Sequence, residues 1–567
     1  MGTMDSRRWR VLWAIAAGSL LYLLQILPIV SAALDSPPGY VPARAIRNLD
    51  LPQYLTWAEA GRHAWLFPNY HAPWRTEPWM FQPLMSVVGH VAQWTQQTVV
   101  LIYNLCHWLV VMAGTYCLIA ALRTFCPRAS EARWAVFWMI CSVPLFLLAY
   151  PLAGLTPVPR QFFAVGMISW GYETADGLIR GGQSNCFSLS WSTMVILGGV
   201  TLLGRLLQSR NRRWYWSFCG LVGVATFLHP FESFLLVPLA YVALVLLKQF
   251  SPAMLVAPLV AGGLGMSPYL WATLRSEALR DASGLLDWRM SSPLWVPSSF
   301  GIPAILLIYL LLLRLRLPEA TDKLLAGWFG LCPVLAYVPG IPFALHLFNG
   351  YVVCVGMLLV RRYRADPKLM ASVSRAPRLR QSLTAAVALL SLVSLASFYR
   401  QAWQDGRRAD TELLLSAVEP AEQSSLLATL RSLPRDGAVL APADLAPWVA
   451  TTLHPAWGSH DFLSITYAAQ NKEAARFYAD ETTEEQRMAL IAGQRFRYVV
   501  TSRPGLLPSR DPIASAGRYQ LYAFPGNTLG GYPGSVALGL TPSSTLRQGI
   551  LRRLRSLVQS RVKPPGL

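Results

Sequence analysis

The sequence VVLIYNLCHWLVVMAGTYCLIAAL, residues 99–122, decides the fold class because it contains no Asp, Glu, Lys or Arg. About 20 apolar residues in a helix cross the roughly 30 Å of hydrocarbon in a bilayer, and this run is long enough. Comparable runs recur as far as about residue 400 and then stop. We therefore predict an α-helical polytopic membrane protein with about eleven transmembrane helices. They are residues 11–33, 99–122, 134–152, 187–208, 214–230, 232–248, 253–273, 299–316, 325–347, 349–363 and 382–399.

Two pairs of these helices are so closely connected that each admits a second interpretation. Residues 214–248 and residues 325–363 could each form a broken or re-entrant helix, because irregular backbone at membrane depth is tolerated inside protein or beside a water-filled cavity. The first span follows a basic start, as a signal peptide does, but it is longer than a typical signal sequence. We expect it to stay uncleaved.

The formal net charge of +20 is concentrated in the membrane part of the chain. Residues 1–400 contain 31 Lys and Arg against 15 Asp and Glu, whereas residues 401–567 contain 18 against 14. The excess lies in short connectors between apolar runs, which is the positive-inside pattern of membrane proteins. We interpret the charge as topology, with a cytoplasmic N-terminus and the C-terminal part outside, and we expect no nucleic-acid partner.

The spans divide the chain into three parts. Residues 1–400 form the membrane part, with long outside loops at residues 34–98 and 153–186. Residues 401–545 alternate β-type and helical runs, which predicts a small soluble α/β domain. Its predicted strands are residues 437–440, 497–501 and 519–524, and its predicted helices are residues 471–480 and 483–492. Residues 546–567 predict a basic amphipathic helix on anionic lipid, or a solvated tail.

The cysteines exclude two kinds of site. All eight lie in the first 400 residues, nearly all in or beside apolar runs, and no two have the C-x-x-C spacing. Neither a disulfide framework nor a cysteine zinc site is indicated. We expect no cofactor, and a divalent metal ion stays an open alternative. The chain has no Gly-rich phosphate loop, which argues against a nucleotide-sugar donor.

Polar side chains suited to group transfer lie in regions predicted to face the same side of the membrane. A carboxylate can accept the proton of an attacking hydroxyl, while imidazole and guanidinium groups can stabilise a departing phosphate. Asp50 is the candidate catalytic base. The candidate substrate-binding residues are Tyr54, His71 and Glu77 in the first loop, Arg160, Glu173 and Asp176 in the second, and His229 and Glu232 between two spans.

Several of these residues also have a simpler interpretation. The aromatic residues of the first loop are typical of anchors at the level of the lipid headgroups. His229 precedes Pro230 and could bond the carbonyl groups that a broken helix leaves free. Glu173 and Asp176 could lie in water, where a carboxylate needs no partner.

Short motifs recur along most of the chain in a fixed order: Asp50-x-x-x-Tyr54, Pro68-x-Tyr70, Pro83, Glu173, His229-Pro230, Tyr337-x-Pro339, Gly458-x-His460, Lys472, Phe477-Tyr478 and Tyr498-Val499-Val500. This order resembles that of the GT-C superfamily, bacterial polytopic membrane glycosyltransferases that use polyprenyl-phosphate sugars as donors. The resemblance implies that Asp50 activates the acceptor and that Glu173 and His229 line the donor pocket.

The chain departs from the superfamily pattern at two places. Leu51 follows Asp50 where many relatives carry a second acidic residue. Residues 344–346 are Ala, Leu and His, where relatives often carry paired basic residues, and this weakens the expectation that the segment binds phosphate.

The sequence thus leads to the hypothesis of a glycosyltransferase in the bacterial inner membrane. It would transfer a hexose or pentose from a polyprenyl-phosphate carrier to a cell-envelope acceptor at the outer face, with membrane lipids around it. A transporter or lipid flippase is one alternative, although mid-span ionisable residues are scarce and no inverted repeat is evident. A non-catalytic membrane assembly protein is the other.

Overall fold

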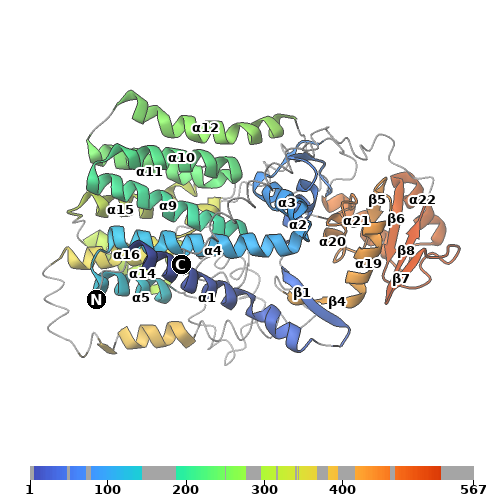
Figure 1. Cartoon of the computed structure of the whole chain (residues 1–567). Helices are drawn as coiled ribbons and strands as arrows, with labels where there is room; N and C mark the ends of the chain where they lie inside the picture. Colours follow the sequence, from blue (N-terminus) through green and yellow to red (C-terminus); the bar gives the residue numbers. More distant parts are fainter. Residues whose placement is uncertain are drawn as a thin grey trace, which may run out of the picture.

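Figure 1 shows the computed structural model of the chain, in which a bundle of helices lies beside a smaller region that contains a β-sheet. The predicted second loop, residues 153–186, and the predicted tail, residues 546–567, lie outside the residues that the structure describes. The described residues are 6–36, 38–47, 51–71, 78–142, 187–248, 251–275, 295–313, 317–338, 341, 344–366, 378, 381–382, 384–393, 416–459 and 467–524.

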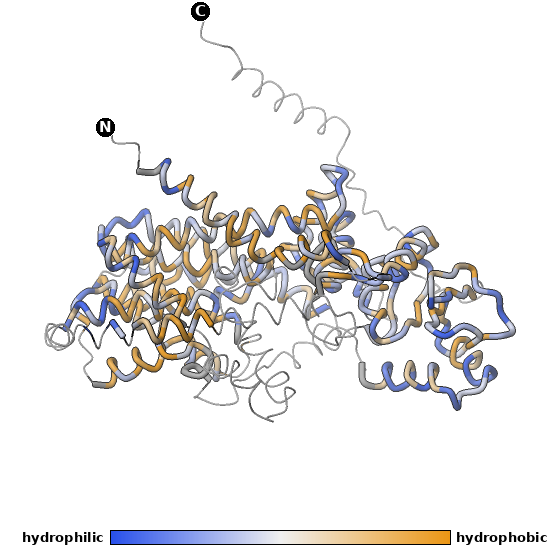
Figure 2. Tube along the Cα trace, turned by 90° about the horizontal axis from the view of Figure 1, so that it is seen from below, coloured by the Kyte–Doolittle hydropathy of each residue, from blue (hydrophilic) through white to orange (hydrophobic). Residues whose placement is uncertain are grey.

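The bundle is built from apolar helices whose axes run roughly parallel (Figure 1). The hydropathy colouring is mostly hydrophobic along these helices and mixed in the C-terminal region (Figure 2). The helices are α1 (Ser6–Leu34), α4 (Val99–Phe125), α5 (Ala129–Cys141), α9 (Phe187–Ser209), α10 (Arg212–Leu228), α11 (Ser233–Leu247), α12 (Pro252–Arg275), α14 (Trp295–Leu313), α15 (Ala320–Leu335) and α16 (Tyr351–Arg364).

Among the described residues, four helical segments combine the length and the apolar composition needed to cross a membrane. They are Val99–Phe125, Phe187–Ser209, Pro230–Leu247 and Pro252–Arg275. Helix α12 also exposes large apolar side chains, such as Leu264 at 69% exposure, which suits a lipid environment better than water. The helical membrane bundle predicted from the sequence is therefore confirmed in outline, while the number of eleven crossings stays a prediction.

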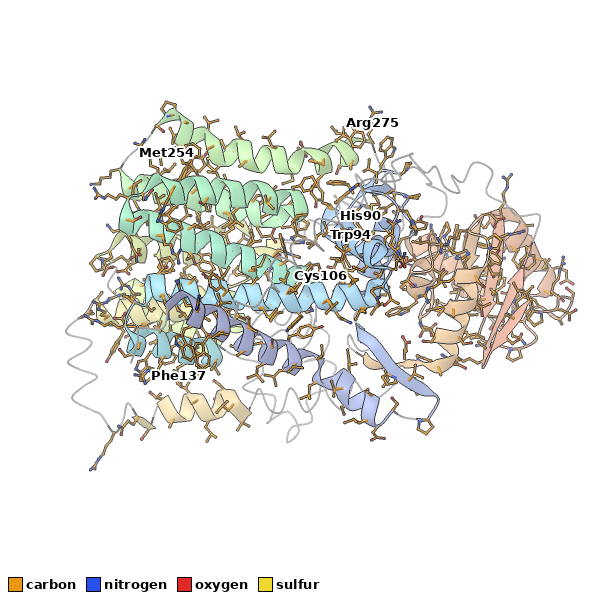
Figure 3. All side chains as sticks on the ribbon, viewed as in Figure 1. His90, Trp94, Cys106, Phe137, Met254 and Arg275 are labelled. Atoms are coloured by element: carbon orange, nitrogen blue, oxygen red, sulfur yellow. The ribbon has the colours of Figure 1, made fainter. Side chains whose placement is uncertain are left out.

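The first predicted loop, residues 34–98, contains two short helices, α2 (Leu51–Gly61) and α3 (Pro83–Thr95). They cross closely at two glycines, because a Cβ on Gly61 would collide with Ser86 and a Cβ on Gly89 would collide with the Ala58 carbonyl. Figure 3 shows His90 and Trp94 of α3 between the bundle and the C-terminal region. Arg275 marks the end of α12 on this side, and Met254 marks the opposite end (Figure 3).

Two helices of the bundle are broken, as the second interpretation of the sequence allowed. Pro230 begins a short 3-10 helix, η2 (Pro230–Glu232), between α10 and α11. Helix α15 ends at Leu335, and a second 3-10 helix, η3 (Ala344–Phe348), precedes α16. The predicted continuous helix over residues 325–347 is therefore wrong. We call the place where η2 and η3 pack together the η2–η3 junction.

A four-stranded sheet with the order β5-β6-β8-β7 forms the core of the C-terminal region. Strands β5 and β6 are parallel, and the other pairs are antiparallel. The predicted strands are confirmed as β5 (Ala438–Leu440), β6 (Phe496–Thr501) and β8 (Tyr519–Ala523), whereas β7 (Ala514–Ala516) was missed. The helices around it are α19 (Ala421–Ser432), α20 (Ala446–Ala450), α21 (Tyr467–Tyr478) and α22 (Glu484–Gln494).

The first predicted loop pairs with the chain that enters the C-terminal region. Strand β1 (Tyr40–Arg47) follows α1 and is antiparallel to β4 (Ser416–Pro420). A small second pair, β2 (Leu66–Phe67) with β3 (Met80–Phe81), closes the loop that carries α2 into α3. These pairings fix the first loop between the bundle and the sheet.

A buried ion cluster holds α15 to α16 at the bundle end farther from the sheet. The Arg361 side chain is 5% exposed, and its Nε lies 2.6 Å from Oδ1 of Asp322, which is 3% exposed. Its Nη2 lies 2.5 Å from Glu319 Oε2, whose side chain is 56% exposed. The Arg361 charge therefore depends mainly on Asp322 for compensation.

We predict that Asp322→Ala lowers the free energy of unfolding by about 3–5 kcal/mol, because it leaves a buried guanidinium without its enclosed partner. Glu319→Ala is the matched control and should cost less than about 1 kcal/mol, since an exposed carboxylate contributes little. Thermal or denaturant unfolding in lipid nanodiscs measures both values. Equal losses for the two variants would contradict this ranking.

His454 is a buried titratable group next to the sheet. It is 0% exposed, its Nε2 donates to the Pro434 carbonyl at 3.2 Å, and its Nδ1 lies 2.9 Å from Thr452 Oγ1. Burial lowers the pKa of His454 from 6.5 to about 4. The folded chain therefore keeps this imidazole neutral at a pH where the unfolded chain binds a proton.

We predict that His454 makes folding pH-dependent between about pH 6.5 and 4. As the pH falls through this window the unfolded state takes up the proton, so the free energy of unfolding drops by about 2–3 kcal/mol. His454→Gln keeps hydrogen-bonding groups but cannot titrate, so its stability should fall less on acidification. Unfolding curves at pH 7 and pH 4 compare the two proteins. Identical pH slopes would count against the assignment.

Candidate functional site

The structure describes four of the nine residues that the sequence analysis singled out. Tyr54, His71, His229 and Glu232 are described. The predicted base Asp50 and the predicted ligands Glu77, Arg160, Glu173 and Asp176 lie outside the described residues. Their roles stay predictions, and the site is built here from the other side chains.

A carboxylate–imidazole pair lies at the η2–η3 junction. The Nδ1 of His229 is 2.7 Å from Oε1 of Glu232, and the Glu232 side chain is fully buried. Ser192 Oγ on α9 donates a second hydrogen bond to the same carboxylate oxygen. The sequence placed His229 and Glu232 at this end of two spans, and the structure brings them into direct contact.

Pro230 produces this contact. It has no N–H to continue α10, and its ring prevents a straight passage into α11. His229 therefore adopts an extended conformation with φ −157° and ψ 106° and caps the end of α10. In a 3-10 turn residues three apart lie on one side, which places the imidazole beside the Glu232 carboxylate.

The imidazole of His229 is oriented by its neighbours. With Nδ1 held by Glu232, the other ring nitrogen, Nε2, has no hydrogen-bond partner among the described residues. The ring packs against Phe231 and His346, with centroid separations of 4.8 Å and 5.4 Å. A carboxylate behind one ring nitrogen fixes the orientation of the other, so Nε2 can accept a proton and, once the ring is an imidazolium, can donate to a phosphate oxygen.

The start of α9 connects this pair to the first predicted loop. Ser188, Ser190 and Ser192 occupy alternate positions, and each hydroxyl bonds a different element. Ser188 donates to the Tyr54 hydroxyl on α2 at 3.2 Å, and Ser190 lies 2.9 Å from His107 Nε2 on α4. Because Ser188 and Ser192 are one helical turn apart, Tyr54 and Glu232 attach to the same end of α9. The structure thus brings together three of the four described candidate residues, which are Tyr54, His229 and Glu232.

Helix α2 carries Tyr54 and begins at Leu51, which follows Asp50 in the sequence. Leu51 is 2% exposed and belongs to the apolar cluster that joins α2, α3 and α4. Tyr54 also packs edge-on against Trp57, with ring centroids 5.7 Å apart. The segment that begins next to the predicted base is therefore firmly attached to the bundle.

His71 joins the first loop to the C-terminal region. It is 0% exposed, and its Nδ1 lies 2.8 Å from Ser459 Oγ. The preceding residue, Tyr70, accepts a backbone hydrogen bond of 2.9 Å from Ala456 N–H, and burial raises the pKa of the Tyr70 phenol. The contacts of His71 are those of an interface between two parts of the chain, and its predicted contact with substrate stays a prediction.

Sequence reasoning missed Ser192, the third member of the Glu232 cluster. A hydroxyl on an apolar helix usually bonds the carbonyl four residues earlier, as Thr193 does with Leu189 at 3.0 Å. The alternation Ser188-x-Ser190-x-Ser192 at the start of a span was the available signal.

Among the described residues, no group of three His, Cys, Asp or Glu side chains could hold a metal ion.

Comparisons with known proteins bear on the fold. No protein-family model matches the sequence. No curated protein matches it either. Among solved structures, the chain is similar to the archaeal oligosaccharyltransferase AglB from Archaeoglobus fulgidus in complex with an inhibitory peptide and a dolichol-phosphate. The sequence identity is 12%, the TM-score is 0.51, and the match covers 86% of this chain and 69% of AglB.

Two further solved structures match the chain. The A. fulgidus oligosaccharyltransferase in complex with Zn and sulfate has 12% identity, a TM-score of 0.50 and coverage of 86% of this chain and 67% of its own. ArnT from Cupriavidus metallidurans bound to undecaprenyl phosphate has 12% identity and coverage of 91% and 98%, but its TM-score of 0.48 is too low to establish a shared fold. In fold, the chain resembles the GT-C glycosyltransferases, as its motifs predicted.

Proposed function

We propose that the chain is a membrane glycosyltransferase that transfers a sugar from a polyprenyl-phosphate carrier to an acceptor in the cell envelope. The observation that carries the proposal is the His229–Glu232 pair, 2.7 Å apart and held at the same bundle end as α2. A buried carboxylate at membrane depth is costly, and such groups usually serve function. The fold shared with AglB supports the same class of activity.

The proposed reaction is a displacement with inversion at the anomeric carbon. An acceptor hydroxyl forms the new bond to this carbon, while the bond between the carbon and the phosphate oxygen breaks. The phosphate leaves with the bonding electron pair and stays on the lipid carrier. Asp50 accepts the hydroxyl proton, which a carboxylate in a partly dry site can do.

His229 supplies the complementary contact on the donor side. As an imidazolium, the ring would donate from Nε2–H to an oxygen of the departing phosphate, where negative charge develops, while Nδ1–H stays on Glu232. Glu232 acts as a positioning residue, because it orients the imidazole rather than touching the reacting atoms. Arg160 is a further candidate for the phosphate, and Glu173 and Asp176 are candidates for the donor pocket.

The proposed setting is the bacterial inner membrane. About eleven crossings with a cytoplasmic N-terminus would place α2, the η2–η3 junction and the C-terminal α/β domain at the outer face. Helix α2 and the C-terminal sheet lie at the same end of the bundle (Figure 1), and Ser188 and Ser192 attach α2 and η2 to the start of α9. The carrier would then enter from the lipid and the acceptor from water.

We predict that Asp50→Asn abolishes transfer while expression and thermal stability stay at the wild-type level. Loss of a general base costs about 10²–10⁴ in rate, because an amide cannot accept the hydroxyl proton. Membranes that contain each variant can be supplied with radiolabelled sugars on a polyprenyl phosphate, and the label transferred from the lipid to the acceptor fraction counted. Full activity in the variant would remove Asp50 from the mechanism.

We also predict that Glu232→Gln lowers kcat about 10–100-fold, because supporting residues of this kind act by orienting the reactive group. Ser192→Ala is the matched control. It removes the other hydrogen bond to the same oxygen but leaves the charge that holds His229. Its kcat should fall less than that of Glu232→Gln. Equal kinetics in wild type and Glu232→Gln would refute a positioning role.

A further inference from the structure

Asn349 is a buried polar residue next to the candidate site. It follows η3 at the turn into α16 and is 0% exposed. Neither its Oδ1 nor its Nδ2 has a hydrogen-bond partner among the described residues. A primary amide offers two donors and two acceptor positions, so this side chain has considerable unused bonding capacity.

An unpaired amide in a protein interior is unfavourable and rare. Burial removes the hydrogen bonds that the amide makes to water, and nothing replaces them. A leucine of similar volume would fill the position without this penalty. Asn349 is therefore better explained by a partner that arrives from outside the chain than by packing alone.

Asn349 is tied through its backbone to a residue that packs against His229, because its N–H donates to the His346 carbonyl at 3.2 Å. His346 lies three residues earlier on η3 and contacts both His229 and Phe231, with centroid separations of 5.4 Å and 5.1 Å. The next residue, Gly350, has a φ of 78° and lies against Trp328 and against Leu197 on α9. Leu197 is five residues deeper along α9 than Ser192, which bonds Glu232. Asn349 therefore lies between His346, which contacts His229, and Gly350, which lies against α9.

Glu232 has unused capacity in the same junction. Its Oε1 accepts hydrogen bonds from Ser192 and His229, whereas its Oε2 is buried and has no partner among the described residues. Oε2 can only accept a hydrogen bond while the carboxyl is ionised, and the Asn349 amide can donate and accept. A hydroxyl group donates once and accepts twice, so it complements both.

We propose that Asn349 and Glu232 Oε2 together bind hydroxyl groups of the donor sugar and so help to select which sugar is transferred. The inference rests on the proposed function and adds a recognition site to it. The ligand is a neutral polyhydroxyl group, because a phosphate beside Oε2 would meet a negative charge. The His229 Nε2 would hold the phosphate at the outer side of the same junction.

A first experiment needs no ligand. Asn349→Leu should leave the melting temperature of the chain in nanodiscs unchanged or raise it by a few degrees, because the variant replaces an unpaired amide by apolar packing. Asn104→Leu on α4, which lines a different, apolar pocket with Ser19 and Trp108, controls for the substitution itself. A fall of several degrees for Asn349→Leu beyond that of the control would assign Asn349 a structural role and overturn the inference.

A second experiment measures binding with defined probes. The probes are farnesyl phosphate and the same lipid phosphate linked to a pentofuranose, a hexopyranose or a 2-amino hexose. The wild-type chain should bind at least one sugar-bearing probe more tightly than farnesyl phosphate. Asn349→Leu should weaken the binding of that probe about tenfold, which is the effect of losing one hydrogen bond to a neutral group. The affinity for farnesyl phosphate should stay unchanged.

The outcomes separate this inference from the proposed function. If wild type and Asn349→Leu bind every sugar-bearing probe equally while both bind farnesyl phosphate, only the sugar site is refuted. If the wild-type chain binds none of the probes, the proposed function falls and the sugar site with it. A tenfold loss confined to the sugar-bearing probe supports both.

Discussion

The interruption of a membrane helix at Pro230 is the constraint on which the candidate site depends. Proline removes one backbone hydrogen bond and prevents α10 from continuing into α11. The short 3-10 turn that follows brings residues 229 and 232 to the same side and directs the Glu232 carboxylate into the bundle. An uninterrupted helix would leave the Glu232 backbone inside a regular span and would not hold His229 in the extended conformation that lets it meet the carboxylate.

The cost of burying Glu232 then determines the residues around it. A carboxylate that is 1% exposed needs donors, and Ser192 and His229 supply them to one oxygen. Well-packed apolar side chains would hold η2 against α9 at least as firmly, since buried ionic groups seldom add net stability. An acid, an imidazole and an amide at one helix break are therefore better explained by a ligand than by folding.

The sequence was sufficient for the features that follow from local composition. Apolar runs such as residues 99–122 predict helices, and β-branched runs such as residues 497–501 predict strands. Both predictions succeed because the secondary structure of these segments follows from the residues within them. The motif His229-Pro230 also located the helix break. What escaped prediction depends on contacts between distant segments: Ser192 bonding Glu232 forty residues away, β1 pairing with β4, and His71 meeting Ser459. A single sequence holds no record of such pairings, so Asn349 could not be told from an ordinary polar residue within an apolar span, and only the serine alternation pointed to Ser192.

Helix α9 gives these separate contacts a common geometry. Its first turns bond α2 through Ser188, α4 through Ser190 and η2 through Ser192. A helix is stiff over so short a length, with a rise of about 6 Å per four residues, so the three partners are held at fixed separations. The first loop is fastened from its other side by β4 and by Ser459. The loop that would present the acceptor and the junction that would hold the donor are thus positioned by one rigid element. Transfer between two bound substrates requires such fixed geometry, because small displacements of the reacting groups greatly reduce the rate.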